Sequence, residues 1–188
     1  MLALLALACL AQEGKPAQKE APPPPNRIVL HNEHNGPEGN SGTAEANVYL
    51  MAKSGNVLWR AKNVKVEWSK TEDKATIIPY KVSPNTKIAR IKVEVTKWHH
   101  RCGGLAEIQV FRNDELISED SFATASSENM KNDLRTPMTL TDGNTSSARE
   151  LHGYCILAND VPGWFEVDMT RSRSGKSKSQ KKTEPVKP

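Results

Sequence analysis

Residues 89–95 read ARIKVEV, a run in which Ile91, Val93 and Val95 alternate with charged side chains. Alternation with a period of two is the pattern of a β-strand that has one face in a hydrophobic core and the other in solvent. The three apolar side chains are therefore expected to point inward. The rest of the chain can be compared with this strand.

The same alternation recurs on both sides of this strand. Residues 52–56 (AKSGN) separate two apolar segments as in a β-hairpin, and other loops are rich in Asn, Gly and Ser. No helical stripe with a 3.6-residue period is found. Many short strands separated by turns are typical of a β-sandwich, so the predicted class is all-β. The further inward positions expected from the pattern are Val64, Val66, Trp68, Ile108, Val110, Phe165 and Val167.

The chain has 188 residues and a net charge of +4, but this charge is unevenly distributed. Seven cations and one carboxylate lie between Arg171 and Pro188, so this tail carries +6 and the rest of the chain −2. A nucleic-acid-binding fold is expected to carry its basic charge on a folded face, so no nucleic-acid partner is expected. The tail at residues 171–188 is predicted to be disordered. It either binds an anionic surface electrostatically or is a solvated extension.

Residues 1–11 (MLALLALACLA) form an apolar run that ends in small residues, the pattern of a signal peptide. The run is too short to span a bilayer, which takes about 20 apolar residues, so no transmembrane segment is expected. Cleavage is predicted after Ala11, and the alternative is a lipoprotein with the lipid on Cys9. Residues 12–25 end in four prolines and are expected to form an extended linker. The sequence predicts an exported protein that is secreted, periplasmic or lipid-anchored at the cell envelope.

Two parts of the chain resemble the two halves of one known domain, in reversed order. Residues 121–169, with the motifs ATASSEN, LTDGNTSS, HGYC and PGWFEVDM, are similar to the first half of the discoidin, or coagulation-factor C-type, domain. Residues 26–111, from NRIVLHNEHN to GGLAEIQVF, are similar to its second half. The resemblance implies a galactose-binding-like jelly-roll β-sandwich, circularly permuted, in one domain at residues 26–170. We therefore expect a monomer in which Thr170 lies near Asn26.

The segment LTDGNT at residues 140–145 resembles the loop that wraps a structural calcium ion in many members of this family. A hard cation needs several oxygen ligands, which a carboxylate, hydroxyls and carbonyls on a glycine turn can supply. The resemblance implies Ca²⁺ ligands from Asp142, Asn144 and Thr145, completed by Glu107 from the last strand of the family's order. The alternative is an Asx-type turn without a metal, because Asp-Gly-Asn forms turns on its own.

The resemblance also implies a carbohydrate site on loops at one edge of the sandwich. Sugar recognition needs an aromatic face for the C–H side of the ring and fixed polar groups for the hydroxyls. The implied ligand-binding residues are Trp98, His99, Arg101 and His152. Leu151 stands where carbohydrate-binding members have a Trp. The alternative is that Trp98 caps the core and the histidines are solvated loop residues.

Two cysteines, Cys102 and Cys155, lie outside the predicted signal peptide. In an exported protein a disulfide is the simplest explanation for such a pair. The spacings His99-x-x-Cys102 and His152-x-x-Cys155 also fit a tetrahedral zinc site, since zinc accepts two Cys and two His ligands. Two free thiols are the third alternative.

These features favour a non-catalytic binding module that attaches its bearer, or a partner, to glycans at a cell surface or matrix. The alternative is a protein-interaction or structural module of the cell envelope, whose loops bind another protein. An enzyme is not expected, because no carboxylate pair can be assigned acid and base roles. A Cys–His nucleophile is not expected either, since no orienting partner can be identified.

Overall fold

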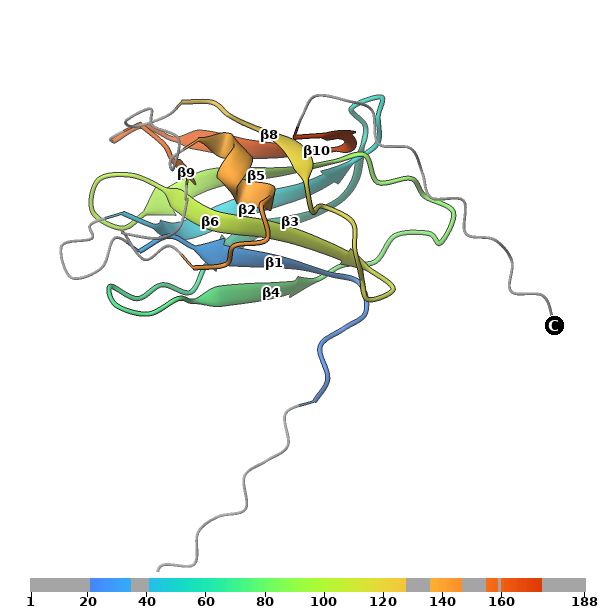
Figure 1. Cartoon of the computed structure of the whole chain (residues 1–188), viewed down its shortest axis with the longest axis horizontal. Helices are drawn as coiled ribbons and strands as arrows, with labels where there is room; N and C mark the ends of the chain where they lie inside the picture. Colours follow the sequence, from blue (N-terminus) through green and yellow to red (C-terminus); the bar gives the residue numbers. More distant parts are fainter. Residues whose placement is uncertain (1–20, 35–40, 128–135, 147–154, 159, 174–188) are drawn as a thin grey trace, which may run out of the picture.

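The computed structural model describes residues 21–34, 41–127, 136–146, 155–158 and 160–173. They form two antiparallel sheets packed against each other (Figure 1). The first sheet has the strand order β4–β1–β6–β7, with β9 also paired to β6, and the second has the order β3–β2–β5–β10–β8. The bounds in the first sheet are β1 Arg27–Asn32, β4 Ala75–Pro79, β6 Gly104–Arg112, β7 Glu115–Leu116 and β9 Cys155–Ile156. Those in the second are β2 Thr43–Met51, β3 Val57–Lys65, β5 Arg90–Trp98, β8 Ser121–Ala125 and β10 Gly163–Ser172.

The hydrophobic core lies between the sheets and receives side chains from both. Ile91, Val93 and Val95 are fully buried in it, as the alternation in β5 predicts. Burial of one such side chain stabilises the fold by about 1.5–3 kcal/mol. The all-β sandwich predicted from the sequence is thereby confirmed. The other predicted inward positions found in this core are Val66, Ile108, Val110, Phe165 and Val167.

One short 3-10 helix, η2 (Pro137–Thr141), is the only helix among the described residues. It contacts β6 and β8, and Leu140 on it is fully buried in the core. This packing brings the loop that begins at Asp142 close to β6. In the part of the chain that the structure covers, no helix is long and apolar enough to cross a membrane.

The hairpin predicted around residues 52–56 is present between β2 and β3. The amide of Ala52 donates to the carbonyl of Asn56 at 2.9 Å, and Gly55 adopts a φ of +91° in the turn. The alternation predicted through Trp68 ends earlier, because β3 stops at Lys65. Val66 still reaches the core, whereas Trp68 leaves it and packs on the loops described below.

A second hairpin joins β6 to β7. Asn113 and Asp114 form its two-residue turn and both have a positive φ, 50° and 63°. Positive φ at both central residues is what a type I′ turn requires, and the twist of such a turn matches that of the flanking strands. The connection is fixed further by Ser118, whose hydroxyl accepts from the amide of Val110 and donates to the carbonyl of Ile108.

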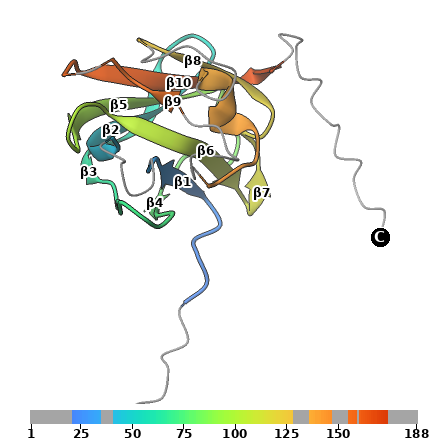
Figure 2. The ribbon, with the colours of Figure 1, turned by 60° about the vertical axis from the view of Figure 1, so that its left-hand side comes forward.

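Strands β1 and β10, which would be consecutive in the unpermuted order, belong to different sheets. Figure 1 shows β1 beginning and β10 ending at the same end of the sandwich, and Figure 2 shows them in opposite layers. The chain therefore enters and leaves the fold at one end. The predicted signal peptide, most of the linker and most of the basic tail lie outside the described residues.

Candidate functional site

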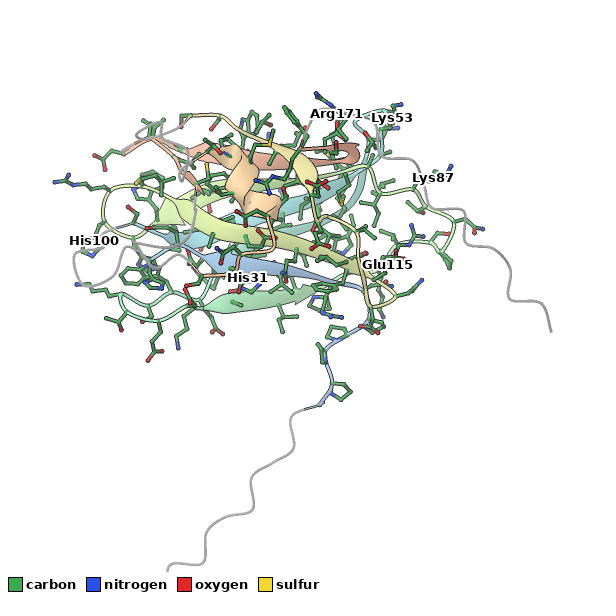
Figure 3. All side chains as sticks on the ribbon, viewed as in Figure 1. His31, Lys53, Lys87, His100, Glu115 and Arg171 are labelled. Carbon is green, nitrogen blue, oxygen red and sulfur yellow. The ribbon has the colours of Figure 1, made fainter. Side chains whose placement is uncertain are left out.

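The loop that follows β1 and the loop between β5 and β6 meet at one end of the sandwich. The amide of His99 donates to the carbonyl of Gly42 at 2.9 Å, and the amide of Gly42 donates to that of Cys102 at 3.1 Å. Figure 3 shows His100 at this end, opposite the end that carries Lys87 and Glu115. We refer to these residues as the loop end: Glu33, His34, Ser41, Gly42, Trp68 and residues 98–102.

A stacked pair of rings is the central feature of the loop end. The indole of Trp68 and the imidazole of His99 have centroids 4.3 Å apart and an interplanar angle of 16°. Trp68 is anchored by its Nε1–H, which donates to the carbonyl of Ser41 at 2.8 Å. Gly42 makes room for the indole, since a Cβ there would lie 2.4 Å from it. The imidazole is thereby held in one orientation.

Burial lowers the pKa of His99, and the neighbouring His100 lowers it further. An imidazole with a pKa below its ordinary value of 6.5 is neutral at pH 7. A neutral imidazole has one nitrogen that donates and one that accepts. The loop end thus presents a fixed ring with both hydrogen-bonding functions.

The four predicted sugar-binding residues have different surroundings. Trp98 is half buried and packs against the main core, which agrees with the alternative role considered for it. His99 lies in the stack, and Arg101 is exposed beside it. His152 lies outside the described residues. Trp68, the aromatic partner of His99, was not expected here because its spacing from Val64 and Val66 continues a strand pattern.

Two further polar residues of the loop end are buried. Glu33 is fully buried, and a Cβ on Gly104 would lie 3.1 Å from its Oε2. His34 is also buried, and its Nε2 lies 2.8 Å from Oδ1 of Asp73. The His34–Asp73 contact connects the loop after β1 to the loop before β4.

Within the described part of the chain, no disulfide joins Cys102 and Cys155. Cys155 pairs with Leu105, three residues beyond Cys102, which corresponds to about 10 Å along a strand. Disulfides require Cα atoms within about 4.4–6.8 Å. The two residues also face different clusters: Cys155 belongs to the main core, and Cys102 packs with Ala106 and Ile156. The predicted disulfide is therefore not seen in this structure.

The thiol of Cys102 donates to the hydroxyl of Ser41 at 3.3 Å. The zinc alternative required both cysteines to converge with His99 and His152. Cys102 and Cys155 point into different clusters, and His152 is outside the described residues. No group of three or more His, Cys, Asp or Glu side chains arranged for a metal is found in the described ranges.

Glu107 and the loop at residues 142–146 form a second polar cluster. Glu107 on β6 is fully buried, and its Oε1 accepts from the amide of Gly143 at 3.3 Å. Its Oε2 is buried without a hydrogen-bond partner among the described residues. The loop closes as an Asx turn, because the amide of Asn144 donates to Oδ1 of Asp142 at 2.9 Å. The half-buried Thr145 follows in the same loop.

The pKa of Glu107 is raised to about 8, first by burial and then by the nearby carboxylate of Asp142. A buried acceptor without a partner and a second carboxylate close by both favour a bound cation. Glu107 and Asp142 supply two carboxylates, and Asn144 and Thr145 could add carbonyl, amide or hydroxyl oxygens. This oxygen set suits a hard ion such as Ca²⁺.

A cleft of about 450 Å³ opens between β3 and β4, each of which is an edge strand of its sheet. Trp59 and Tyr80 meet there with centroids 6.0 Å apart, and Tyr80 donates its hydroxyl to the carbonyl of Phe111. None of the predicted site residues lines this cleft. The lining residues are Pro24, Pro25, Asn26, Trp59, Pro79, Tyr80 and Lys81.

No protein-family model matches the chain, and no curated protein or solved structure is significantly similar to it. The likeness to discoidin domains therefore depends on the sequence motifs quoted above. The β-sandwich follows from the structure itself.

Proposed function

We propose that this protein is an exported, non-catalytic module that binds glycans of a cell surface or matrix through its loop end. The observation that carries the proposal is the neutral His99 imidazole, held at 4.3 Å against Trp68 beside the exposed Arg101. A sugar hydroxyl donates one hydrogen bond and accepts others, so an imidazole with one donor and one acceptor matches it. Arg101 adds several donors in a fixed fork.

His99→Ala is expected to weaken binding to the protein's glycan by about tenfold, the effect of one lost buried hydrogen bond or slightly more. The glycan is first identified by screening the purified protein on a glycan array, and affinity is then measured by calorimetry. Arg101→Ala is expected to act in the same direction.

His31→Ala is the matched control, because His31 is also half buried and also has its pKa lowered by burial. It lies on β1, bonded to Gln109 at 3.2 Å, and should leave affinity unchanged. An array without any bound glycan, or equal losses in the two histidine variants, would exclude this site. Binding of a protein ligand through the same residues would instead support the protein-interaction alternative.

The second part of the proposal is a structural Ca²⁺ at Glu107, Asp142, Asn144 and Thr145. It is supported by the buried Oε2 of Glu107 and by the neighbouring Asp142 carboxylate. When bound, the ion would neutralise the two carboxylates and fix the loop after η2. No direct contact between this ion and a glycan is proposed.

The third part concerns the type of sandwich, which we propose to be a circularly permuted, galactose-binding-like jelly roll spanning residues 26–170. Its support is the main core, which receives side chains from both sheets, among them those of β1 near the start and β10 near the end of the described residues. We expect a monomer by light scattering and one cooperative unfolding transition by calorimetry, since strands of both sheets share that core. A dimer that exchanges halves, or two separate transitions, would contradict the permuted domain.

A further inference from the structure

The outer face of the second sheet carries a regular array of charged and aromatic side chains. Strand register places Arg60 of β3 opposite Tyr49, Tyr49 opposite Lys92, and Lys92 opposite Glu166. A second row runs from Asn47 through Glu94 to Trp164. Side chains at these positions point away from the core, because their neighbours along each strand are buried in it. We refer to the following as the outer sheet face: Glu45, Asn47, Tyr49, Arg60, Lys62, Lys65, Arg90, Lys92, Glu94, Lys97, Trp164 and Glu166.

The carboxylates of the outer sheet face already have partners within it. Glu45 forms ion pairs with both Lys65 and Lys97. Glu94 accepts hydrogen bonds from the Asn47 amide and the Tyr49 hydroxyl, each at 3.1 Å. Hydrogen bonding from Lys65 and from Asn47 lowers the pKa of Glu45 and Glu94 respectively, so both stay ionised and engaged.

Two further carboxylates on β10 point to the same side: Glu166 pairs with Arg90 at 3.3 Å, and Asp168, opposite Arg90, accepts hydrogen bonds from Thr170. The cations of the face are more numerous than these partners. Arg60 and Lys62 are exposed on β3, and neither forms an ion pair with any described residue. Lys92 forms no ion pair with a described residue either, and its Nζ lies 5.2 Å from the centroid of the Trp164 ring. The face therefore presents a net positive surface to a ligand, although the chain before Arg171 is mildly acidic as a whole.

The aromatic rings of the face help to distinguish between nucleic acid and another polyanion as its ligand. Proteins that bind single-stranded nucleic acid offer exposed ring faces on which bases stack. Here Nζ of Lys92 lies over the ring of Trp164, and the guanidinium carbon of Arg171 lies over the ring of Phe122 on β8, 4.1 Å from its centroid. The hydroxyl of Tyr49 is bound to Glu94. The face thus offers cations and polar groups on a sheet rather than stacking platforms.

We propose that the outer sheet face binds an acidic polysaccharide, whose carboxylate or sulfate groups pair with Arg60, Lys62 and Lys92. Asn47 on β2, the strand between β3 and β5, has a polar side chain of the kind that bonds sugar hydroxyls. The three cations lie on β3 and β5 and are not residues of the loop end, so the proposal does not depend on a glycan site there. Figure 3 shows Arg171 and Lys53 at the far end of the molecule from His100. Arg171 lies on β10 of this sheet, and the basic tail continues the positive charge in the sequence.

The test uses the full-length protein and three immobilised probes: heparin, polygalacturonate and neutral dextran. The variant Arg60→Ala/Lys62→Ala/Lys92→Ala is compared with Lys70→Ala/Lys81→Ala/Lys87→Ala, which removes the same charge from exposed loop positions. We expect the first variant to bind heparin or polygalacturonate about tenfold more weakly than wild type at low salt, as three exposed ion pairs would give. The second should lose less than about threefold, and both should keep the wild-type melting temperature.

Equal losses in the two variants would overturn the proposal, because they would show a response to total charge or to the tail alone. Binding to dextran as strong as to the acidic probes would do so as well. A single-stranded oligothymidine is measured in parallel: affinity equal to that for the polysaccharides, lost in the same variant, would assign the face to nucleic acid instead. The loop-end variant His99→Ala should bind heparin and polygalacturonate as strongly as wild type. The test of the outer sheet face is therefore independent of whether the loop end binds a glycan.

Discussion

As the pH rises, the wild-type protein is expected to lose on the order of 4–5 kcal/mol of its free energy of unfolding because of Glu107, and the Glu107→Gln variant should not show this loss. The buried carboxyl has its pKa raised from 4.5 to about 8. The folded protein therefore keeps a proton that the unfolded chain releases between these two values. Stability from this group is fully present below pH 4.5 and is lost progressively toward pH 8.

The measurement is urea unfolding of wild type and Glu107→Gln at several pH values between 5 and 9. Histidines with lowered pKa values, His31 and His99, change stability in the opposite direction below about pH 6.5. Both proteins share that effect, so the difference between them isolates Glu107. Glu115→Gln, at an exposed position on β7, is the matched control and should follow the wild-type curve. Parallel wild-type and Glu107→Gln curves would mean that Glu107 is already ionised in the fold.

The same samples test the cation. At pH 9 and without metal, Glu107 and Asp142 repel each other, so millimolar Ca²⁺ should raise the wild-type melting temperature by binding the folded state. Glu107→Gln should respond little. A pH effect without a Ca²⁺ effect would leave Glu107 as a buried acid and would remove the calcium site from the proposal.

Phe165→Ala is expected to destabilise the protein by about 3–5 kcal/mol. Phe165 is fully buried on β10, between β5 and β8, and is the largest of the fully buried side chains among the described residues. Its removal takes apolar contacts from both sheets and leaves a cavity that the surrounding β-structure cannot close. Urea unfolding at one pH gives the free energy directly, from the shift of the midpoint at constant slope.

Phe122→Ala is the control on the neighbouring strand. Phe122 is half exposed on β8, and its ring is contacted by Arg171 at 4.1 Å. An exposed cation–π contact stabilises by about 0.5–1 kcal/mol, so the loss should be small. Similar losses in the two phenylalanine variants would show that β10 is not packed in the core in the way described.

The fold class was predictable because inward and outward side chains alternate regularly along most of β5 and β10. Ile91, Val93 and Val95 needed no tertiary information to be assigned inward. Alternation cannot reveal where a strand loses its partner, however. Trp68 continues the pattern of Val64 and Val66, but β3 ends at Lys65, and the indole turns toward His99.

The candidate site was harder to predict, since its geometry depends on register. A disulfide between Cys102 and Cys155 was predicted because the protein is expected to be exported and has two cysteines outside the signal peptide. The pairing of β6 with β9 instead places the two residues in different clusters. The environment of Glu107 likewise results from η2 packing on β6, which no local motif encodes. In the sequence, Gly42 is one of several glycines in a loop. Its role follows from the fold, because a Cβ at this position would lie 2.4 Å from the indole of Trp68.

The edge strands β3 and β4, on one side of the sandwich, affect whether copies of the protein associate at high concentration. Unpaired strand edges tend to recruit strands from other molecules, and short length, proline and lysine oppose this. Strand β4 has five residues and ends in Pro79, while β3 carries Arg60, Lys62 and Lys65. Repulsion between these cations keeps neighbouring copies from joining edge to edge. A dense layer of the protein on a surface would then stay a collection of separate molecules instead of growing into a continuous fibre.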